Sequence, residues 1–455
     1  MRRLLKDVPW PVLILVAGII APFELSLYAG SVRLPPHRIA ILLCVLPAAW
    51  KLMLGRGVRL SIYDVLFFCY AAWTLGVLIK HEGLSSGAEF GGALALESFG
   101  GYIIARAYIR DQRAFEATIR LLFGVLVVMG LIALAESLVG QQFLRSWLQK
   151  VTGTYYRLKI EQRLGLTRAT TTFEHPILYG TFCASLFAYA WFLSRSWFQR
   201  GWRSSYVAGA TFLSLSSAPL LCIIVQMTMI VWEKLTRRLR FRALISIIVA
   251  VAIYIIVEIT SNRGAIEAIV LRVTIDAWTA YTRIQIWTYG LENVWNNPLW
   301  GIGRSDWARV WWMSSNSVDA FWLVIMMRVG IPAPVLLGLS IILLVARVYR
   351  GAHRQASFEV RQLSYAWTIS ILAMVFVALT VHYWNSTHAY FFMLLGAGGW
   401  IADPRKLPAP AARRQMVSRL TPVPARPRVA SMPRPFHAHA LEPFPIVRDR
   451  YPRSS

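Results

Sequence analysis

The segment NNPLWGIGRSDWARVWWMSSNSVDAFW (residues 296–322) is a polar and aromatic interruption between two long apolar parts of the chain. It contains five tryptophans, two arginines, two aspartates and two glycines that flank an isoleucine. A long loop of this composition is typical of a membrane–water interface or of a ligand-binding loop. The sequence on both sides of the loop indicates what class of protein contains it.

The chain has 455 residues, of which 56% are hydrophobic and 15% are charged, with a mean hydropathy of +0.50. Its apolar residues come in runs of about 18 or more, which is the length that crosses a bilayer core. A soluble protein is less apolar and more charged than this. The composition therefore predicts an all-α fold, a polytopic membrane helix bundle.

About 12 transmembrane helices are predicted, with both termini on the cytoplasmic side. Lys and Arg gather at one side of successive apolar runs, which identifies the side that stays in the cytoplasm. The loops at about 140–174 and 259–317 then face outside. The predicted helices cover residues 9–29, 37–54, 61–79, 92–109, 119–139, 176–194, a hairpin within 206–233 that turns at SLSSAP, 243–258, 318–348 with a hinge at RVGIP, 365–383 and 388–402.

The net charge of +26 has two interpretations. Most of it follows from topology, because cationic loops are retained in the cytoplasm. The other interpretation is attraction to anionic lipids or to anionic lipid-linked substrates. Nucleic acid is not an expected partner, because no nucleic-acid-binding module accompanies the basic runs. The four cysteines lie in apolar runs and are predicted to be small core residues.

The sequence divides into a membrane domain, residues 1–402, and a basic tail, residues 403–455. The tail is rich in proline and arginine and has no apolar periodicity. Such a composition cannot bury a core, so the tail is predicted to be disordered and cytoplasmic.

Five arginines in the two outside loops are candidates for binding an anionic substrate. Their position runs against the bias of cationic residues toward the cytoplasm, and guanidinium suits bidentate binding of phosphate oxygens. The alternative for each is a solvated surface charge. Trp287 lies one helical turn after the third of them and shares its helix face. These arginines are Arg163, Arg168, Arg283, Arg304 and Arg309.

Four residues are candidates for proton transfer. Histidine titrates near neutral pH, and His382 and His388 flank the short turn HYWNSTH. His175 starts a helix in FEHPILYG, and Asp319 precedes another helix, so both are equally explained as capping or interface residues. No His, Cys or Asp spacing indicates a metal site, and no nucleotide-binding motif is present, so neither a metal nor a cofactor is expected.

Several segments together resemble one family. RIQIWTYGLENVWNNPLWGIGRSDWARVWWMSSNSVDAFWLVIMMRVGIPAPVLL (residues 283–337) is similar to the signature of the O-antigen ligase and polymerase superfamily. TTFEHPILYGTFCA (residues 171–184) resembles an earlier segment of that family. ESFGGYIIARAYIRD (residues 97–111) and SLSSAPL (residues 214–220) resemble its exopolysaccharide-polymerase branch. The likeness covers most of residues 10–400.

The resemblance implies a metal-independent glycosyltransferase of the bacterial inner membrane that works on the periplasmic side. Its donor would be a saccharide on undecaprenyl diphosphate, and arginines would hold the diphosphate. Arg283 matches the loop arginine of the family, and Arg163 or Arg168 would be its partner. Flippase and chain-length regulator proteins are further partners that the family suggests, besides the membrane lipids.

Two products remain open under this resemblance. A polymerase would join repeat units into exopolysaccharide or O-antigen, whereas a ligase would transfer glycan to lipid A-core or another acceptor. Ligases carry a His-Asn pair where this chain has Ser315, Asn316 and Ser317. The residues therefore favour the polymerase, with Asp319, His382 or His388 as the base.

A different class, a transporter or a non-catalytic subunit for export of lipid-linked sugar, also remains open. Transporters place charges within their membrane spans and are built from repeats. Four acidic residues lie in or near the predicted spans, although no repeat is visible. They are Glu24, Asp64, Glu97 and Glu136.

Overall fold

A computed structural model describes residues 6–30, 32–55, 60–153, 160–236, 238–239, 242–260, 277–313, 317–355 and 357–403. These residues are mostly helical, and six of their helices are long and apolar enough to cross a membrane. The chain is therefore a helical membrane protein in its coarse architecture. The tail from residue 404 on and the pair Ser315 and Asn316 lie outside the described residues.

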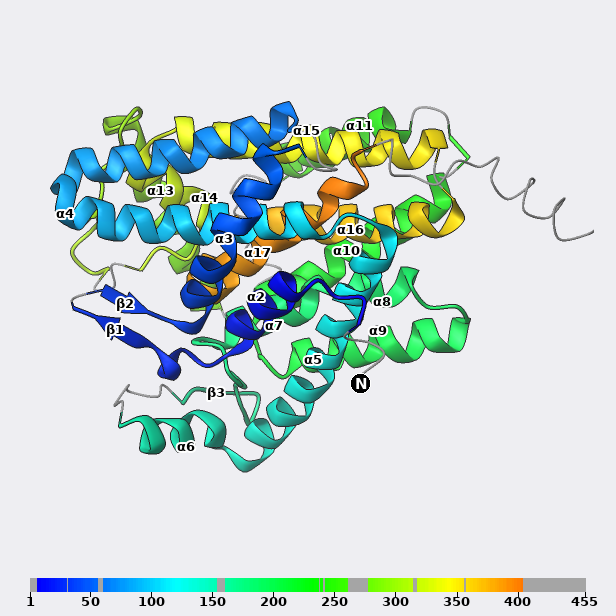
Figure 1. Ribbon diagram of the computed structural model, residues 1–455, viewed down its shortest axis with the longest axis horizontal. Helices are drawn as coiled ribbons and strands as arrows, with labels where there is room; N and C mark the ends of the chain where they lie inside the picture. The colour runs from blue at the N-terminus through cyan, green and yellow to red at the C-terminus, as the bar shows by residue number, and fades with distance from the viewer. Residues whose placement is uncertain are drawn as a thin grey trace, which may run out of the picture. The chain divides into compact units, whose positions relative to one another are not determined.

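The N-terminal quarter contains a short helix, a β-hairpin and two longer helices (Figure 1). The elements are α2 (Trp10–Ile20), η1 (Phe23–Leu25), β1 (Leu27–Ala29), β2 (Val32–Leu34), α3 (Pro36–Met53) and α4 (Ile62–Tyr108). The predicted helix over 9–29 ends at Ile20, because Ala21 is extended and precedes Pro22, which disfavours a helical residue before it. The remainder forms η1 and the strand β1, which pairs antiparallel with β2.

The helix α4 contains both predicted spans 61–79 and 92–109. It bends at Gly83, whose φ of 79° lies in the left-handed region that favours glycine. A capping box formed by Ser61 and Asp64 starts the helix. The two arms of α4 thus run in opposite directions, and the bend marks one end of the bundle (Figure 1).

The middle of the chain supplies the next helices and a second hairpin. The elements are α5 (Gln112–Val139), α6 (Phe143–Thr152), β3 (Gln162–Arg163), β4 (Leu166–Thr167), α7 (Pro176–Ser185), α8 (Phe187–Phe192), α9 (Trp197–Phe212) and α10 (Ser217–Thr236). The predicted helical hairpin with its turn near SLSSAP is confirmed, since α9 ends at Phe212 and α10 begins at Ser217. Its arms are longer than the 13 residues or so that we expected.

The last elements are α11 (Arg242–Thr260), α13 (Ala277–Asn296), α14 (Phe321–Val329), α15 (Pro332–Gln355), α16 (Phe358–Val377), α17 (Asn385–Ala397) and η2 (Gly398–Trp400). The predicted hinge at RVGIP is confirmed between α14 and α15, where Gly330 has a φ of 80°. The predicted loop 259–317 is not wholly a loop, because its second third is the helix α13. The aromatic and amide residues of α13 gave it no clear apolar periodicity.

Small residues bring α17 close to the second arm of α4. A Cβ atom on Gly101 would lie 2.6 Å from the carbonyl oxygen of Ala389. Gly396 approaches the Tyr102 carbonyl in the same way from the other helix. Close packing through glycines is typical of helices inside membranes. These contacts fix the start of α17, and with it the turn that precedes this helix.

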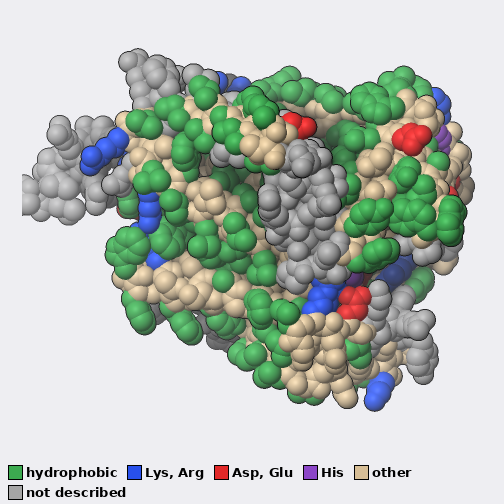
Figure 2. Space-filling view, turned by 180° about the vertical axis from the view of Figure 1, so that it is seen from behind, with side chains coloured by type: hydrophobic (Ala, Val, Ile, Leu, Met, Phe, Trp, Pro, Cys, Tyr) green, Lys and Arg blue, Asp and Glu red, His purple; other side chains and the backbone are tan. Residues whose placement is uncertain are grey.

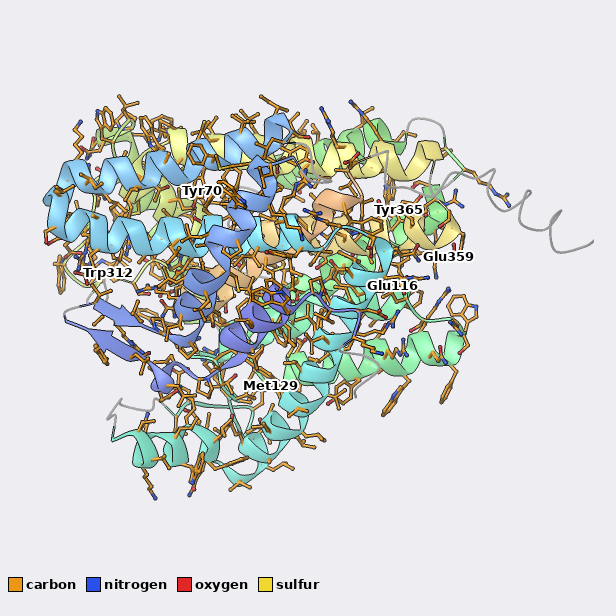
Figure 3. All side chains as sticks on the ribbon, viewed as in Figure 1. Tyr70, Glu116, Met129, Trp312, Glu359 and Tyr365 are labelled. Atoms are coloured by element: carbon orange, nitrogen blue, oxygen red, sulfur yellow. The ribbon has the colours of Figure 1, made fainter. Side chains whose placement is uncertain are left out.

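The bundle has two distinct ends. Trp312 lies at the end marked by the bend of α4, whereas Glu116 and Glu359 lie at the opposite end (Figure 3). Hydrophobic side chains cover much of the surface between the two ends (Figure 2). Elsewhere on the molecule, Leu43 and Leu46 of α3 are 63% and 76% exposed, and Val128 and Leu131 of α5 are 57% and 61% exposed. Such a surface is suited to lipid.

Candidate functional site

The polar loop 297–313 is held against the end of α14 by its two glycines. Ile302 donates its backbone N–H to Met327 O at 2.7 Å, and Gly303 donates to Arg328 O at 3.0 Å. Gly301 and Gly303 have φ values of 65° and 62°. A Cβ on Gly301 would lie 2.5 Å from Met327 O. The Gly-Ile-Gly pattern therefore reflects a close approach of two backbones.

The end of the first arm of α4 holds the same loop from a second side. His81 Nε2 lies 3.1 Å from Trp300 O, and Glu82 accepts the backbone N–H of Arg304 at 2.9 Å. The ammonium group of Lys80 stands 3.5 Å from the Trp300 ring centroid, a cation–π contact. Sequence reasoning missed this attachment, although the charged triplet before Gly83 interrupts an apolar run.

A cavity of about 420 Å³ lies between this loop, the second half of α14 and the segments that precede α14 and α17. Its size is within the range of small-molecule sites, about 300–1,000 Å³. Its charged and histidine lining consists of Arg304, Asp306, Asp319, Arg328 and His382. Its aromatic lining consists of Trp307 and Trp384. Two predicted proton-transfer residues and one predicted arginine are thus brought together here.

The two proton-transfer candidates of the cavity come from different elements. Phe321 donates its backbone N–H to Ala378 O at 2.9 Å and to Val381 O at 3.1 Å, which ties the start of α14 to the segment before His382. Asp319 accepts a hydrogen bond from Ser317 Oγ at 3.0 Å. Burial, and after it the charge of Arg328, lowers the pKa of His382 to about 3. His382 is therefore neutral at physiological pH.

Arg283 is a buried cation on α13, with 8% of its surface exposed. Its Nε has no hydrogen-bond partner among the described residues. Burial lowers the pKa of Arg283, the charge of Asp319 raises it, and the charges of Arg163 and Arg168 lower it further. Three of the predicted arginines therefore act on one another, with Asp319 as the nearby anion.

The hairpin of β3 and β4 carries the other two arginines over the turn between α9 and α10. Arg168 donates to Ser216 Oγ at 2.7 Å and to Ser214 O at 3.3 Å, and it forms a salt bridge with Glu161. Arg163 donates to Leu215 O at 3.3 Å. Burial, followed by the charge of Arg163, lowers the pKa of Arg168. The turn SLSSAP thus positions both guanidinium groups.

Arg309 and Trp287 are engaged in local structure. Arg309 donates to Asp306 at 2.6 Å, to Met313 O at 3.0 Å and to Trp307 O at 3.2 Å, so it holds the loop together. Among the described residues, it is not part of the cavity lining. Trp287 donates its indole N–H to Leu379 O at 2.9 Å. It fastens the Arg283 helix to the turn before α17.

The two remaining histidines lie outside the cavity lining of the described chain. His175 caps α7, because its Nδ1 accepts the Ile177 N–H at 3.2 Å. His388 is buried in α17, with Nδ1 3.4 Å from Tyr383 O. Glu174, which directly precedes His175, accepts hydrogen bonds from Trp384 at 3.0 Å and from Asn385 at 2.7 Å. This segment therefore supports the cavity wall.

Arg328 is one of the cavity residues that sequence reasoning did not select as site residues, together with Asp306, Trp307 and Trp384. It lies in the last turn of α14, where a basic residue is favourable for the helix, and it was assigned only to the hinge RVGIP.

The described residues contain no group of three His, Cys, Asp or Glu side chains arranged to hold a metal ion. No protein-family model matches the chain, and no curated protein is significantly similar to it.

Proposed function

We propose that this protein is a polymerase that joins undecaprenyl-diphosphate-linked saccharide units at the periplasmic face of a bacterial inner membrane. The observation that carries the proposal is the grouping of Arg163, Arg168 and Arg283 beside Asp319. Sequence reasoning selected these arginines from two separate loops as a phosphate site. Family resemblance supports the choice of substrate.

The arginine group is suited to a diphosphate. Arg283 keeps a buried Nε without a partner among the described residues, whereas Arg168 is held in place by Ser216 and Glu161. Three guanidinium groups exceed the charge of Glu161 and Asp319 by one. A charge-assisted hydrogen bond to phosphate contributes about 1.5–3 kcal/mol. An anionic headgroup would therefore bind here and relieve the mutual repulsion of the cations.

The cavity would hold the reacting saccharides. The acceptor hydroxyl attacks the anomeric carbon of the donor sugar, the bond from that carbon to the diphosphate oxygen breaks, and the hydroxyl proton passes to a base. Asp319 fits this base best, because it lines the cavity and also acts on Arg283. The arginines stabilise the charge of the departing diphosphate. The lipid diphosphate and the lengthened glycan are the products.

The proposal also specifies how the chain crosses the membrane. We infer about 12 spans, both termini in the cytoplasm, and the site at the periplasmic end. Arg195 lies in the segment between α8 and α9, and Arg200 and Arg203 lie in the first two turns of α9. Figure 1 draws this connection at the end of the bundle opposite to the bend of α4. This distribution supports that orientation.

The buried charges in the spans favour an enzyme over a transporter. Glu97 binds Arg38 at 2.7 Å and His37 at 3.0 Å, and Arg106 binds Asp64 at 3.0 Å. Paired charges of this kind stabilise helix packing and do not by themselves form an ion path. A ligase acting on lipid A-core or another acceptor stays the nearest alternative, because it would use the same diphosphate site.

The proposal is tested with purified full-length protein in nanodiscs and synthetic lipid-linked repeat units, without added proteins. We expect a ladder of products that differ by one repeat unit each. Transfer only to an added lipid A-core acceptor would identify a ligase. Intact substrate with no transfer to any acceptor would contradict the enzymatic function and leave transport or a subunit role. Flippase and chain-length regulator proteins, added later, should change the ladder's length distribution only.

A further inference from the structure

A second pair of cations lies in the cavity, separate from Arg283. The guanidinium carbon of Arg304 stands 4.8 Å from the ring centroid of Phe90, and that of Arg328 stands 5.3 Å from the same ring. Both residues line the cavity. Arg328 is half-buried and Arg304 is exposed, and their two like charges repel each other. Such a pair is stabilised when an anion binds near it.

The pair is not neutralised by the carboxylates of the described chain. Neither Arg304 nor Arg328 forms a salt bridge with any residue that the structure describes. Asp306 is bound to Arg309 at 2.6 Å. Asp319 accepts from Ser317 and acts on Arg283. Both acidic residues of the cavity are thus engaged elsewhere.

The backbone holds the pair in a fixed arrangement. Arg328 O accepts the N–H of Gly303 at 3.0 Å, and the N–H of Arg304 binds Glu82 at 2.9 Å. Arg304 belongs to the polar loop, and the Arg328 carbonyl binds the residue just before Arg304. The backbones of the two arginines are therefore held close together. Both guanidinium groups also lie against the Phe90 ring, so one anion can reach both of them.

We propose that this pair makes the cavity selective for a saccharide that carries an anionic group, either a carboxylate or a phosphate on the sugar ring. The inference rests on the proposed function and adds the class of sugar that is joined. Trp307 and Trp384 supply the aromatic walls that suit a sugar ring in the same cavity. The lipid diphosphate stays with Arg163, Arg168 and Arg283.

The test measures saccharide binding, so it does not depend on turnover. Full-length protein in nanodiscs is titrated with a glucuronate-containing tetrasaccharide, its carboxyl-reduced neutral counterpart, a sugar 6-phosphate and inorganic diphosphate. The variants are Arg328→Gln, Arg304→Gln and Arg283→Gln. Arg120→Gln serves as the matched control, because Arg120 is exposed on α5 and pairs with Glu116.

We expect the wild-type protein and Arg120→Gln to bind the uronate or the sugar phosphate at least about tenfold more tightly than the neutral saccharide. Arg328→Gln and Arg304→Gln should remove this preference and still bind inorganic diphosphate. The anionic probe that binds more tightly identifies the anionic group. Arg304 is exposed, so Arg304→Gln keeps the test valid if Arg328→Gln does not fold.

Three results would overturn the inference. Equal binding of neutral and anionic saccharides by the wild-type protein would show that the pair does not select charge. Loss of diphosphate binding in Arg328→Gln would assign the pair to the diphosphate site. If Arg283→Gln alone loses diphosphate while no variant changes saccharide preference, the proposed function stands and this inference fails.

Discussion

The negative charge of Asp319 raises the pKa of the buried Arg283 guanidinium, and Asp319 also lines the cavity that contains His382. Asp319 therefore belongs to both parts of the site, the arginine group and the cavity. Arg283 comes from α13 and Asp319 from the segment before α14. A base beside the leaving group can accept the acceptor proton while the arginines hold the diphosphate.

Asp319→Asn separates the two roles of this residue. The amide keeps the shape of the side chain and removes the negative charge, so diphosphate binding should be unchanged or tighter. Chain growth should fall by about 10²–10⁴ if Asp319 is the base. Binding of lipid diphosphate and single-turnover transfer are measured on the same preparation. A normal transfer rate would exclude Asp319 as the base and leave His382.

His382 should make the protein sensitive to acid. Its pKa of about 3 lies below the ordinary value of 6.5, so between these values the unfolded chain binds the proton that the folded chain does not. Stability is therefore lost as the pH falls below about 6.5, by about 1–2 kcal/mol at pH 5. His382→Gln should remove this loss. Thermal unfolding of both proteins at pH 7 and pH 5 measures it, and an identical change in both would refute the assignment.

Gly301 should tolerate no side chain. Its φ of 65° and the 2.5 Å approach of a Cβ to Met327 O both oppose alanine. Gly301→Ala should lower stability by about 1–3 kcal/mol. Gly209→Ala on α9 is the control, because no atom lies within 4 Å of its added Cβ. The melting temperatures of Gly301→Ala and Gly209→Ala in detergent measure the difference in stability. Equal values would mean that the loop does not need its close approach to α14.

The orientation in the membrane is tested by labelling in intact cells. Trp311 is 93% exposed near the site, and Glu116 lies at the opposite end of the bundle. A membrane-impermeant maleimide should label Trp311→Cys and leave Glu116→Cys unlabelled, in a background without the native cysteines. Labelling of Glu116→Cys alone would place the site in the cytoplasm, where the proposed substrate is not polymerised.

Much of the helical architecture was predictable, because apolar runs of sufficient length are a strong signal. The hairpin of α9 and α10 followed from the basic residues at both of its ends. A helix turn that joins Arg283 and Trp287 was expected inside the long loop, but the full extent of α13, Ala277–Asn296, was not. The first helix was predicted too long, because Pro22 stops it inside an apolar run.

The site was predictable only in part. Guanidinium groups in the loops predicted to face outside identified Arg163, Arg168 and Arg283, and the charges of the first two lower the pKa of Arg283. The attachment of the polar loop to α4 was not predictable, because Glu82 and Arg304 are 222 residues apart. Arg328 was missed for a related reason. It becomes part of the cavity only when the loop folds back over the end of α14.

The central claim is that Arg283 binds the diphosphate of a lipid-linked donor. Lysine keeps the charge and loses the planar fork that matches two phosphate oxygens, and alanine loses both. Arg120→Lys and Arg120→Ala are the matched controls. Every variant must be present in the membrane at the wild-type level.

The decisive measurement is chain growth on lipid-linked repeat units by Arg283→Lys and Arg283→Ala. We predict a clear loss for lysine and a loss of about 10–100-fold or more for alanine, with both Arg120 variants at wild-type activity. Polymer of normal length and amount from Arg283→Ala would contradict the account, because the diphosphate would then be bound without Arg283.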